Sequence, residues 1–403
     1  MIFLTYWFVV FAIVALPAYW FVPHPGLRKL ILLGSCAVFH THFAGPAGVL
    51  PIVVLGVATY CAGRLRYRPA CIAAIVLCVA SLVFYKYTTF ICRQILGAIS
   101  PELQTESIAL TSPWLPSVPP LAISFFVFEF VHYLVDVYRG RPSIWNVLDF
   151  SLFSIFWPSI VAGPVKRYES FLPSLESGLH SVGERDVAAG TVRVAVGFVK
   201  KLIADNLTAY IAFYGPQFAT FPLRERWFLV LLISLRILLD FSGYSDIAIG
   251  FGRMYGIRLP ENFNWPYLAV NLQDFWRCWH ISLSSWIRDY IYIALGGNRV
   301  GPIRRIANGL LAFGICGLWH GAGWNFLVWG LLHGAGLAIS TNYRTWLGPV
   351  GAKFGNWLDA APPVCWLLTM AFVFITWLFF FYPVADAWKM IEQLFDRHRA
   401  FPH

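Results

Sequence analysis

The sequence predicts an all-α protein that crosses a membrane repeatedly, with about 9 to 11 spans. Hydrophobic residues make up 58% of the chain and charged residues only 12%, whereas about a quarter of the residues in soluble proteins are charged. Apolar runs recur from end to end, and no soluble domain is evident between them. Because a helix needs about 20 apolar residues to cross the hydrocarbon core, these runs are candidate spans.

The first run, residues 1–27, has no Asp, Glu, Lys or Arg, and the cationic pair Arg28-Lys29 follows it. A cleavable signal peptide has the opposite order, so we expect a retained first span. The stretch 30–63 is broken at Gly45-Pro46 and Pro51 and is either one long bent element or two short ones. The candidate spans are 2–22, 30–43, 47–63, 70–91, 119–137, 147–163, 190–214, 227–252, 306–320, 323–341 and 364–382.

The formal charge of +10 comes from cations between the apolar runs. We interpret them as topology signals and as contacts for lipid or anionic ligands, and we expect no nucleic-acid partner. The clearest extramembrane connections are 92–118 and 165–189. The interspersed cations are Arg64, Arg66, Arg68, Arg139, Arg141, Lys166, Arg167, Arg299, Arg304 and Arg305.

The eight cysteines lie mostly within apolar runs and form no CxxC pair, so we expect free, buried thiols. His40 and His42 form an HxH pair without a nearby carboxylate or cysteine. Metal binding usually needs more ligands than that. We therefore expect no metal site and no bound cofactor.

The segment from Arg258 to Arg305 is rich in Trp, Asn, Asp, Arg and Pro while staying strongly aromatic. On a helical wheel, Phe275 to Tyr290 separates into a polar and an aromatic face, which predicts an interfacial or re-entrant amphipathic helix. Its polar face either lines a catalytic cavity or binds lipid phosphates. That face holds Arg277, His280, Ser284 and Arg288.

The stretch from Ile306 to Tyr343 lacks Asp, Glu, Lys and Arg and contains the string LWHGAGWN, residues 318–325. Its glycines weaken a continuous helix beside His320 and allow a ligand to approach. An ionisable residue inside a membrane is a functional candidate by default, and a neutral imidazole can act as a general base. The alternative is a histidine that only hydrogen-bonds a neighbouring helix.

Other polar residues in the apolar runs are weaker candidates for a catalytic role. For His333, in a plain apolar run, a structural role is favoured. Arg236 and Asp240 are spaced i, i+4 and can neutralise each other, so a buried structural ion pair is favoured over catalysis. Asp246 is open to either interpretation.

The usual motifs of several enzyme classes are absent from the chain. It has no GxSxG string of serine hydrolases, no Walker A string of P-loop ATPases and no HExxH string of zincins, and His132 and Asp136 do not have the HxxxxD spacing of soluble-type acyltransferases. A transporter or flippase of an acyl carrier or glycan is a competing hypothesis, although no internal repeat supports it. A scaffold of a polysaccharide export complex is a third hypothesis.

Long strings between residues 124 and 334 carry a resemblance to a known family. They are SFFVFEFVHYLVDVYRG (124–140), FWPSIVAGPVKRYESFLPSL (156–175), GFVKKLIADN (197–206), LDFSGYSDIAIGFGRMYGIRLPENFNWPY (239–267), DFWRCWHISLSSWIRDYIYIALGGNR (274–299) and GLWHGAGWNFLVWGLLHG (317–334). Together they resemble the membrane-bound O-acyltransferase (MBOAT) family, and most closely its bacterial alginate O-acetylation branch.

The resemblance implies an O-acyltransferase with a helical fold around a central funnel, in the bacterial inner (cytoplasmic) membrane. It implies that His320 is catalytic and that His280 is a second active-site residue. Acetyl-CoA, or another acyl-CoA, is the implied cytoplasmic donor, and the acceptor is a cell-envelope polysaccharide or an extracytoplasmic partner protein. The supporting residues that we predict around the two histidines are Arg277, Ser284, Trp319, Asn325 and Asp246.

On this basis we divide the chain into N-terminal helices (1–118), a catalytic core (119–343) and a C-terminal helix with a basic tail (344–403). Two departures from the family pattern are visible. The Arg-Arg-Trp-His motif is Arg277-Cys278-Trp279-His280 here, which keeps the histidine. The chain also ends near residue 403, from which we expect it to lack the extra C-terminal spans of alginate-type members.

Overall fold

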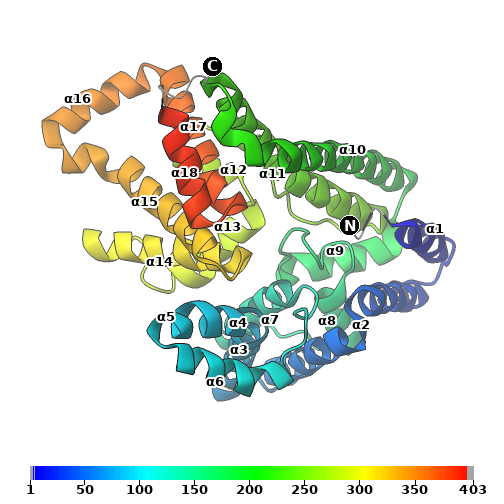
Figure 1. Cartoon of the computed structure of the whole chain (residues 1–403). Helices are drawn as coiled ribbons and strands as arrows, with labels where there is room; N and C mark the ends of the chain where they lie inside the picture. The colour runs from blue at the N-terminus through cyan, green and yellow to red at the C-terminus, as the bar shows by residue number, and fades with distance from the viewer. Residues whose placement is uncertain (1–2, 4, 397–403) are drawn as a thin grey trace. The chain divides into compact units, whose positions relative to one another are not determined.

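The computed structural model describes residues 3 and 5–396 of the 403-residue chain. Regular structure in these residues is helical, and no strand occurs among them (Figure 1). Packing divides the chain into two compact units: unit 1 is Met1–Val196 with Tyr244–Pro260, and unit 2 is Gly197–Gly243 with Glu261–His403. The all-α prediction is confirmed. The functional division predicted at residues 118 and 343 stays a prediction, and most of the predicted basic tail lies outside the described residues.

Unit 1 begins with long apolar helices and continues through shorter ones. The predicted first span corresponds to α1, although its residues 2 and 4 lie outside the described part. The elements are α1 (Tyr6–Trp20), α2 (Pro25–Leu65), α3 (Arg68–Leu82), η2 (Val83–Tyr87), α4 (Thr88–Phe90), η3 (Ile91–Leu96), α5 (Gly97–Ile99), α6 (Pro101–Thr111), η4 (Ser112–Trp114), α7 (Ile123–Tyr138), α8 (Val147–Ile155) and α9 (Tyr168–Ser181).

Aromatic side chains form the core of unit 1 around the fully buried Trp157. Its ring lies 5.6 Å from that of Phe8, 5.4 Å from that of Phe11 and 4.9 Å from that of Phe251. Tilted and edge-on ring pairs contribute about 0.5–1.5 kcal/mol each beyond their burial. This cluster therefore ties α1 to the chain that follows α8 and to the end of α11.

The structure decides between the alternatives for one predicted span in unit 1 and corrects another. The stretch 30–63 lies within α2, which is one element with a non-helical Gly45 (φ 65°, ψ 169°) at its centre, so the bent alternative is the one observed. The predicted span 147–163 is wrong as a helix, because α8 ends at Ile155 and residues 156–167 are irregular. Pro158 explains this, since the residue before a proline avoids helical geometry.

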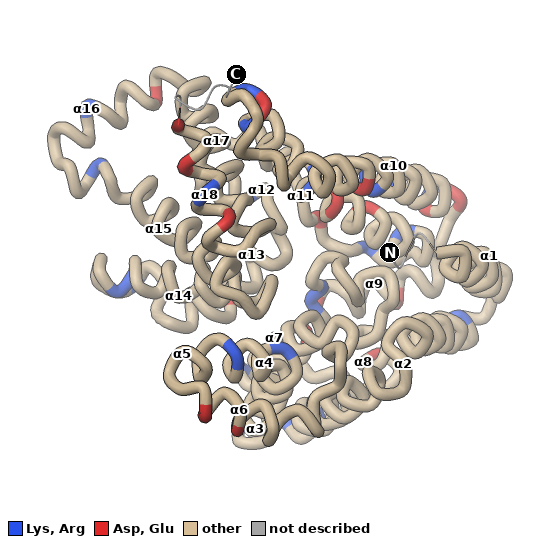
Figure 2. Tube along the Cα trace, viewed as in Figure 1, with Lys and Arg blue, Asp and Glu red and all other residues tan. Residues whose placement is uncertain are grey.

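Two long helices, α10 (Glu184–Tyr214) and α11 (Leu223–Met254), contribute residues to both units. Charged residues are sparse along the chain (Figure 2), and several of those on these helices pair with each other. In unit 2, Asp240 accepts contacts from Arg236 at 3.7 Å and from Lys201. The predicted Arg236–Asp240 pair is confirmed, with Lys201 as a third member. Such pairing offsets the cost of charge within apolar helices.

Unit 2 holds the C-terminal half of the chain. Its elements, besides parts of α10 and α11, are η5 (Gly215–Thr220), η6 (Pro266–Leu268), α12 (Leu272–Cys278), α13 (Ile281–Ile287), η7 (Arg288–Tyr292), α14 (Pro302–His320), α15 (Trp324–Trp346), α16 (Gly348–Asp359), α17 (Pro362–Phe381) and α18 (Val384–Phe395).

The helices α14 and α15 form an antiparallel hairpin with backbones in direct contact. A Cβ added at Gly317 would lie 2.1 Å from the carbonyl oxygen of Phe326, and one added at Gly330 would lie 2.2 Å from that of Phe313. Membrane helices lack a hydrophobic force between them and associate closely through such small residues. The two glycines therefore set the distance between the helices, and the hairpin turn follows His320.

Among the described residues, four helical segments are long and apolar enough to cross a membrane: Pro25–Leu65, Arg68–Ile99, Leu223–Met254 and Pro362–Phe381. The shorter Tyr6–Trp20 is also apolar. The predicted spans 306–320 and 323–341 are helical, as α14 and α15. A multi-pass membrane protein is therefore supported, whereas the predicted total of 9 to 11 spans exceeds these four.

All eight cysteines are free, and five of them are buried, as expected. The single amphipathic helix predicted over Phe275 to Tyr290 is wrong. The chain breaks between α12 and α13, where His280 adopts left-handed backbone angles (φ 42°, ψ 54°). Because the break rotates the following residues, Arg277 and His280 do not share a helical face.

Candidate active site

His320 is the last residue of α14, and the glycine-rich connection that follows it ends the helix, as the sequence predicted. Its side chain is half-buried among aromatic rings. The imidazole lies edge-on to the rings of Phe380 at 5.0 Å and Trp329 at 5.3 Å, measured between centroids. A half-buried imidazole in an apolar surround can meet a ligand while bulk water is limited.

His280 lies beside His320, with 6.5 Å between the ring centroids. It is fully buried at the start of α13, and Phe241 of α11 packs edge-on against it at 4.5 Å. Trp319 contacts both histidines, with its ring 5.9 Å from that of His280 and 4.8 Å from that of His320. Three of the predicted site residues are thus brought together from segments 40 residues apart in sequence.

Burial and the neighbouring His320 both favour the neutral form of His280. This residue lies in the connection between α12 and α13, outside the four candidate spans. Burial lowers the pKa of His280 well below its ordinary value, and the neighbouring His320 lowers it further. A neutral ring offers one nitrogen as a donor and the other as an acceptor.

Hydrogen bonds show which ring nitrogen of His280 is the donor and which is the acceptor. Nδ1 of His280 lies 3.0 Å from Oδ1 of Asn262, whereas its Nε2 is buried without a hydrogen-bond partner among the described residues. Asn262 was missed as a site residue in the sequence, although it lies in the string 239–267. No local signal singles it out, because Glu261 and a second side-chain amide, Asn264, lie within two residues of it.

The remaining predicted residues have local partners. Arg277 is exposed and pairs with Asp274 at 2.9 Å, and the Ser284 hydroxyl donates to the Trp279 carbonyl at 3.1 Å. Asp246 belongs to unit 1, where Arg193 of α10 contacts it at 3.1 Å. The histidine pair belongs to unit 2. The supporting roles of Arg277, Ser284 and Asp246 stay predictions.

Asn325 has a clearer connection to the site. Its side-chain amide donates to the Phe379 carbonyl at 3.2 Å, which ties the first turn of α15 to the last turn of α17. The next residue, Phe380, carries the ring that packs against His320. Asn325 therefore holds one wall of the aromatic surround in place.

His333, for which a structural role was favoured, lies fully buried in α15. Its Nε2 lies 2.9 Å from the Thr376 hydroxyl of α17, and its ring packs against Trp329 at 4.9 Å. These contacts link α15 to α17 behind the aromatic surround and are those of a packing residue.

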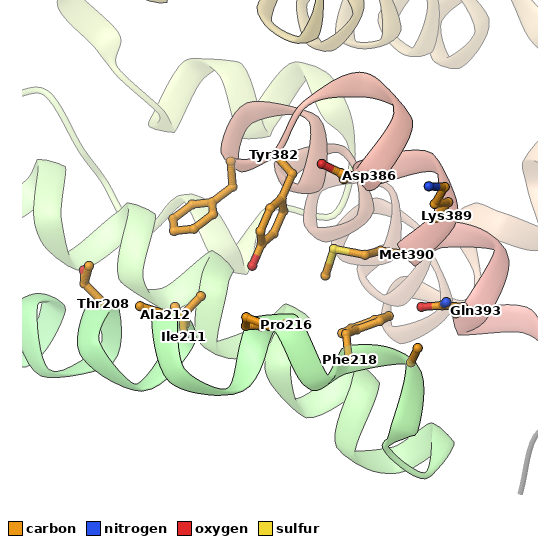
Figure 3. A pocket seen from close by; sticks show the side chains of 13 residues that line it. Thr208, Ile211, Ala212, Pro216, Phe218, Tyr382, Asp386, Lys389, Met390 and Gln393 are labelled. Carbon is orange, nitrogen blue, oxygen red and sulfur yellow. The ribbon is translucent and has the colours of Figure 1, made fainter.

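A cavity of about 530 Å³ lies elsewhere in unit 2, between the end of α10, η5, the end of α17 and α18 (Figure 3). None of the predicted site residues lines it. Phe381 lines it, while Phe380 faces His320, because successive helical residues point about 100° apart. Its polar lining comes from Thr208, Tyr382, Asp386, Lys389 and Gln393.

Comparison with known proteins identifies the class to which this fold and histidine pair belong. The model of the membrane-bound O-acyltransferase family matches residues 88–385. The chain therefore belongs to that family, as the resemblance implied.

Three individual relatives show which members of the family the chain is similar to. The chain is 38% identical to a probable alginate O-acetylase AlgI of Azotobacter vinelandii over 327 residues, covering 79% of this chain and 61% of the relative. It is 36% identical to the Pseudomonas aeruginosa AlgI over 378 residues, with 91% and 66% covered. A peptidoglycan O-acetyltransferase of Helicobacter pylori is 35% identical over 329 residues, with 75% and 60% covered. The chain thus spans less than two thirds of the length of these relatives.

Proposed function

We propose that the protein is an O-acyltransferase that moves an acetyl group from acetyl-CoA to a hydroxyl of a cell-envelope polysaccharide or of a partner protein. The observation that carries this proposal is the pair of adjacent histidines, one fully buried and one half-buried, within an aromatic surround. Family membership supports the reaction class. The named relatives support acetyl as the acyl group and a polysaccharide as the acceptor.

In the proposed reaction, His320 is the general base. It takes the proton of the acceptor hydroxyl while the oxygen attacks the thioester carbonyl. The carbon–sulfur bond then breaks, the ester forms, and His320 returns the proton to the departing thiolate of coenzyme A. Positioned general bases contribute about 10²–10⁴-fold to a rate.

The donor and the location follow from the same proposal. We place the protein in the inner membrane of a bacterium, with acetyl-CoA arriving from the cytoplasm and the acceptor on the outer side. Cationic loops suit the phosphates of coenzyme A, because guanidinium groups bind phosphate through charge-assisted hydrogen bonds. In unit 2 the candidates are Arg299, Arg304 and Arg305.

The test uses purified full-length protein in detergent with radiolabelled acetyl-CoA and polysaccharide acceptors, comparing wild type, His320→Ala and His180→Ala. His180 is an exposed histidine of α9 paired with Glu176, so it is a control for loss of an imidazole. We expect His320→Ala to lose about 10²–10⁴-fold in turnover and His180→Ala to match wild type.

Two results would count against the proposal. If a folded His320→Ala protein transfers acetyl at the wild-type rate, His320 is not the base. If the wild-type protein consumes no acetyl-CoA with any of the acceptors, even after membranes from cells that express it are added to supply missing partners, acetyl-CoA is not the donor.

A further inference from the structure

We propose that Asn262 is a positioning residue that fixes the proton of His280 on Nδ1 and so makes Nε2 the proton-accepting atom of that ring. This inference rests on the proposed function, since it concerns the second histidine of the same site. It assigns His280 a role as an acceptor and excludes a role as a donor that stabilises an oxyanion through Nε2.

The argument begins with the side-chain oxygen of Asn262, which is fully buried. Three groups lie within hydrogen-bond distance of this Oδ1: the backbone N–H of Ser282 at 3.2 Å, the Ser282 hydroxyl at 2.7 Å and Nδ1 of His280 at 3.0 Å. A backbone N–H can only donate. The amide atom facing it must therefore be the oxygen and not the nitrogen, which settles the orientation of the amide.

The tautomer of His280 follows from that orientation. An amide oxygen only accepts, so Nδ1 of His280 must carry the proton when the two are bonded. In the neutral ring, Nε2 then holds a lone pair. It lies buried without a hydrogen-bond partner among the described residues. Because a buried acceptor without a partner is unusual, we infer that a donor from the substrate or from the reacting groups completes it.

The backbone of Asn262 also holds this part of the chain. The carbonyl of Asn262 accepts the N–H of Ile281 at 3.0 Å, so the main chain of this residue holds the residue after His280 while its side chain faces the imidazole. His280 itself has left-handed angles (φ 42°, ψ 54°), which a residue with a Cβ adopts only when its surroundings require it. Asn262 supplies that requirement and also sets the direction of the imidazole.

The groups around His280 determine how the protonation of its ring should depend on pH. Within the described part of the chain, the titratable group that faces it is His320 of α14, and its other ring contacts are the uncharged Phe241 of α11 and Trp319 of α14. A carboxylate in place of the amide of Asn262 would be a new anion against Nδ1. It would favour the imidazolium, in which Nε2 carries a proton and can no longer accept.

The test compares three variants in acetyl transfer over a range of pH. Asn262→Asp keeps an oxygen acceptor, so we expect activity to persist with the acidic limb of the pH profile moved to higher pH. Asn262→Leu removes the acceptor at similar volume, and we expect kcat to fall at least about 10-fold with little change in KM for acetyl-CoA. Ser282→Ala removes another hydrogen bond to the same oxygen without touching His280, and its pH profile should match wild type.

A merely structural Asn262 would lower the yield of folded protein in both Asn262 variants and leave the pH profile unchanged. An unshifted profile in folded Asn262→Asp, or wild-type kcat in folded Asn262→Leu, therefore overturns the proposal.

A second measurement needs neither folding of a variant at residue 262 nor turnover. Nitrogen NMR of the wild-type protein labelled with ¹⁵N-histidine in lipid bilayers reports the protonation of each ring nitrogen, and the signals lost in His280→Gln identify those of His280. We expect Nδ1 protonated and Nε2 unprotonated at neutral pH. The opposite tautomer overturns the positioning role even if the enzyme is active. The expected tautomer in a protein that transfers no acetyl group overturns the proposed function alone.

Discussion

Replacement of Gly317 by alanine tests whether the distance between α14 and α15 sets the position of His320. The Cβ added by this replacement would lie 2.1 Å from the Phe326 carbonyl oxygen. Ordinary carbon–oxygen contacts are about 3.4 Å, so the helices must separate locally by about 1.3 Å. A backbone oxygen cannot rotate aside as a side chain can, and the strain therefore reaches the helix axis.

The expected magnitudes follow from this displacement. Overpacking costs about 1–3 kcal/mol of stability. His320 lies three residues after Gly317 on α14, less than one turn away, so a similar displacement reaches its ring. Because a misplacement of about 1 Å can cost on the order of 10²-fold in rate, we expect kcat to fall by about that factor.

The assay is acetyl transfer per folded molecule, together with thermal unfolding in detergent. Gly309→Ala is the matched control, since it lies on the same helix and an added Cβ there meets nothing within 4 Å. We expect it to keep wild-type activity and to gain up to about 1 kcal/mol from the higher helix propensity of alanine. Equal behaviour of the two variants would refute the view that backbone contact positions the histidine.

Two further predictions concern buried charges. Lys166→Met leaves Glu129, its partner at 2.6 Å, buried and unpaired, so unfolding should become easier by about 3–5 kcal/mol; the double variant with Glu129→Leu should recover most of this in thermal unfolding, and a double variant no better than the single would contradict the pairing. Arg226→Met removes donors to the carbonyls of Ala219 and Gln393, so hydrogen exchange should rise in α18 and not in α9; unchanged exchange in α18 would show that other contacts hold it.

The sequence was informative where a pattern is local. The apolar runs predicted helices, and the glycines after His320 predicted the end of α14. The pair of Arg236 and Asp240 could be predicted because four residues make about one helical turn. Lys201, their third member, comes from another helix 39 residues away, and no local pattern indicates it.

The errors have the same physical origin. The break at His280 lacks a glycine or proline at residues 279 and 280, so the helical periodicity appeared continuous. Tertiary hydrogen bonds to Asn262, 18 residues earlier, overcome that local preference. Asn262 could not be singled out for the same reason, because its importance lies in three donors that the fold brings to one oxygen.

The contact between the backbones of α14 and α15 has a consequence for how a substrate reaches His320. A helix pair held at Gly317 and Gly330 cannot part without separating main chains, so that wall of the site is fixed. The ring of Phe380, which packs against the imidazole, is held in turn by the rings of Phe326, Trp329 and Trp377 at 5.2–5.4 Å. Neither wall of the site then yields to the rotation of a single side chain, so we expect the access to His320 to keep its width during turnover.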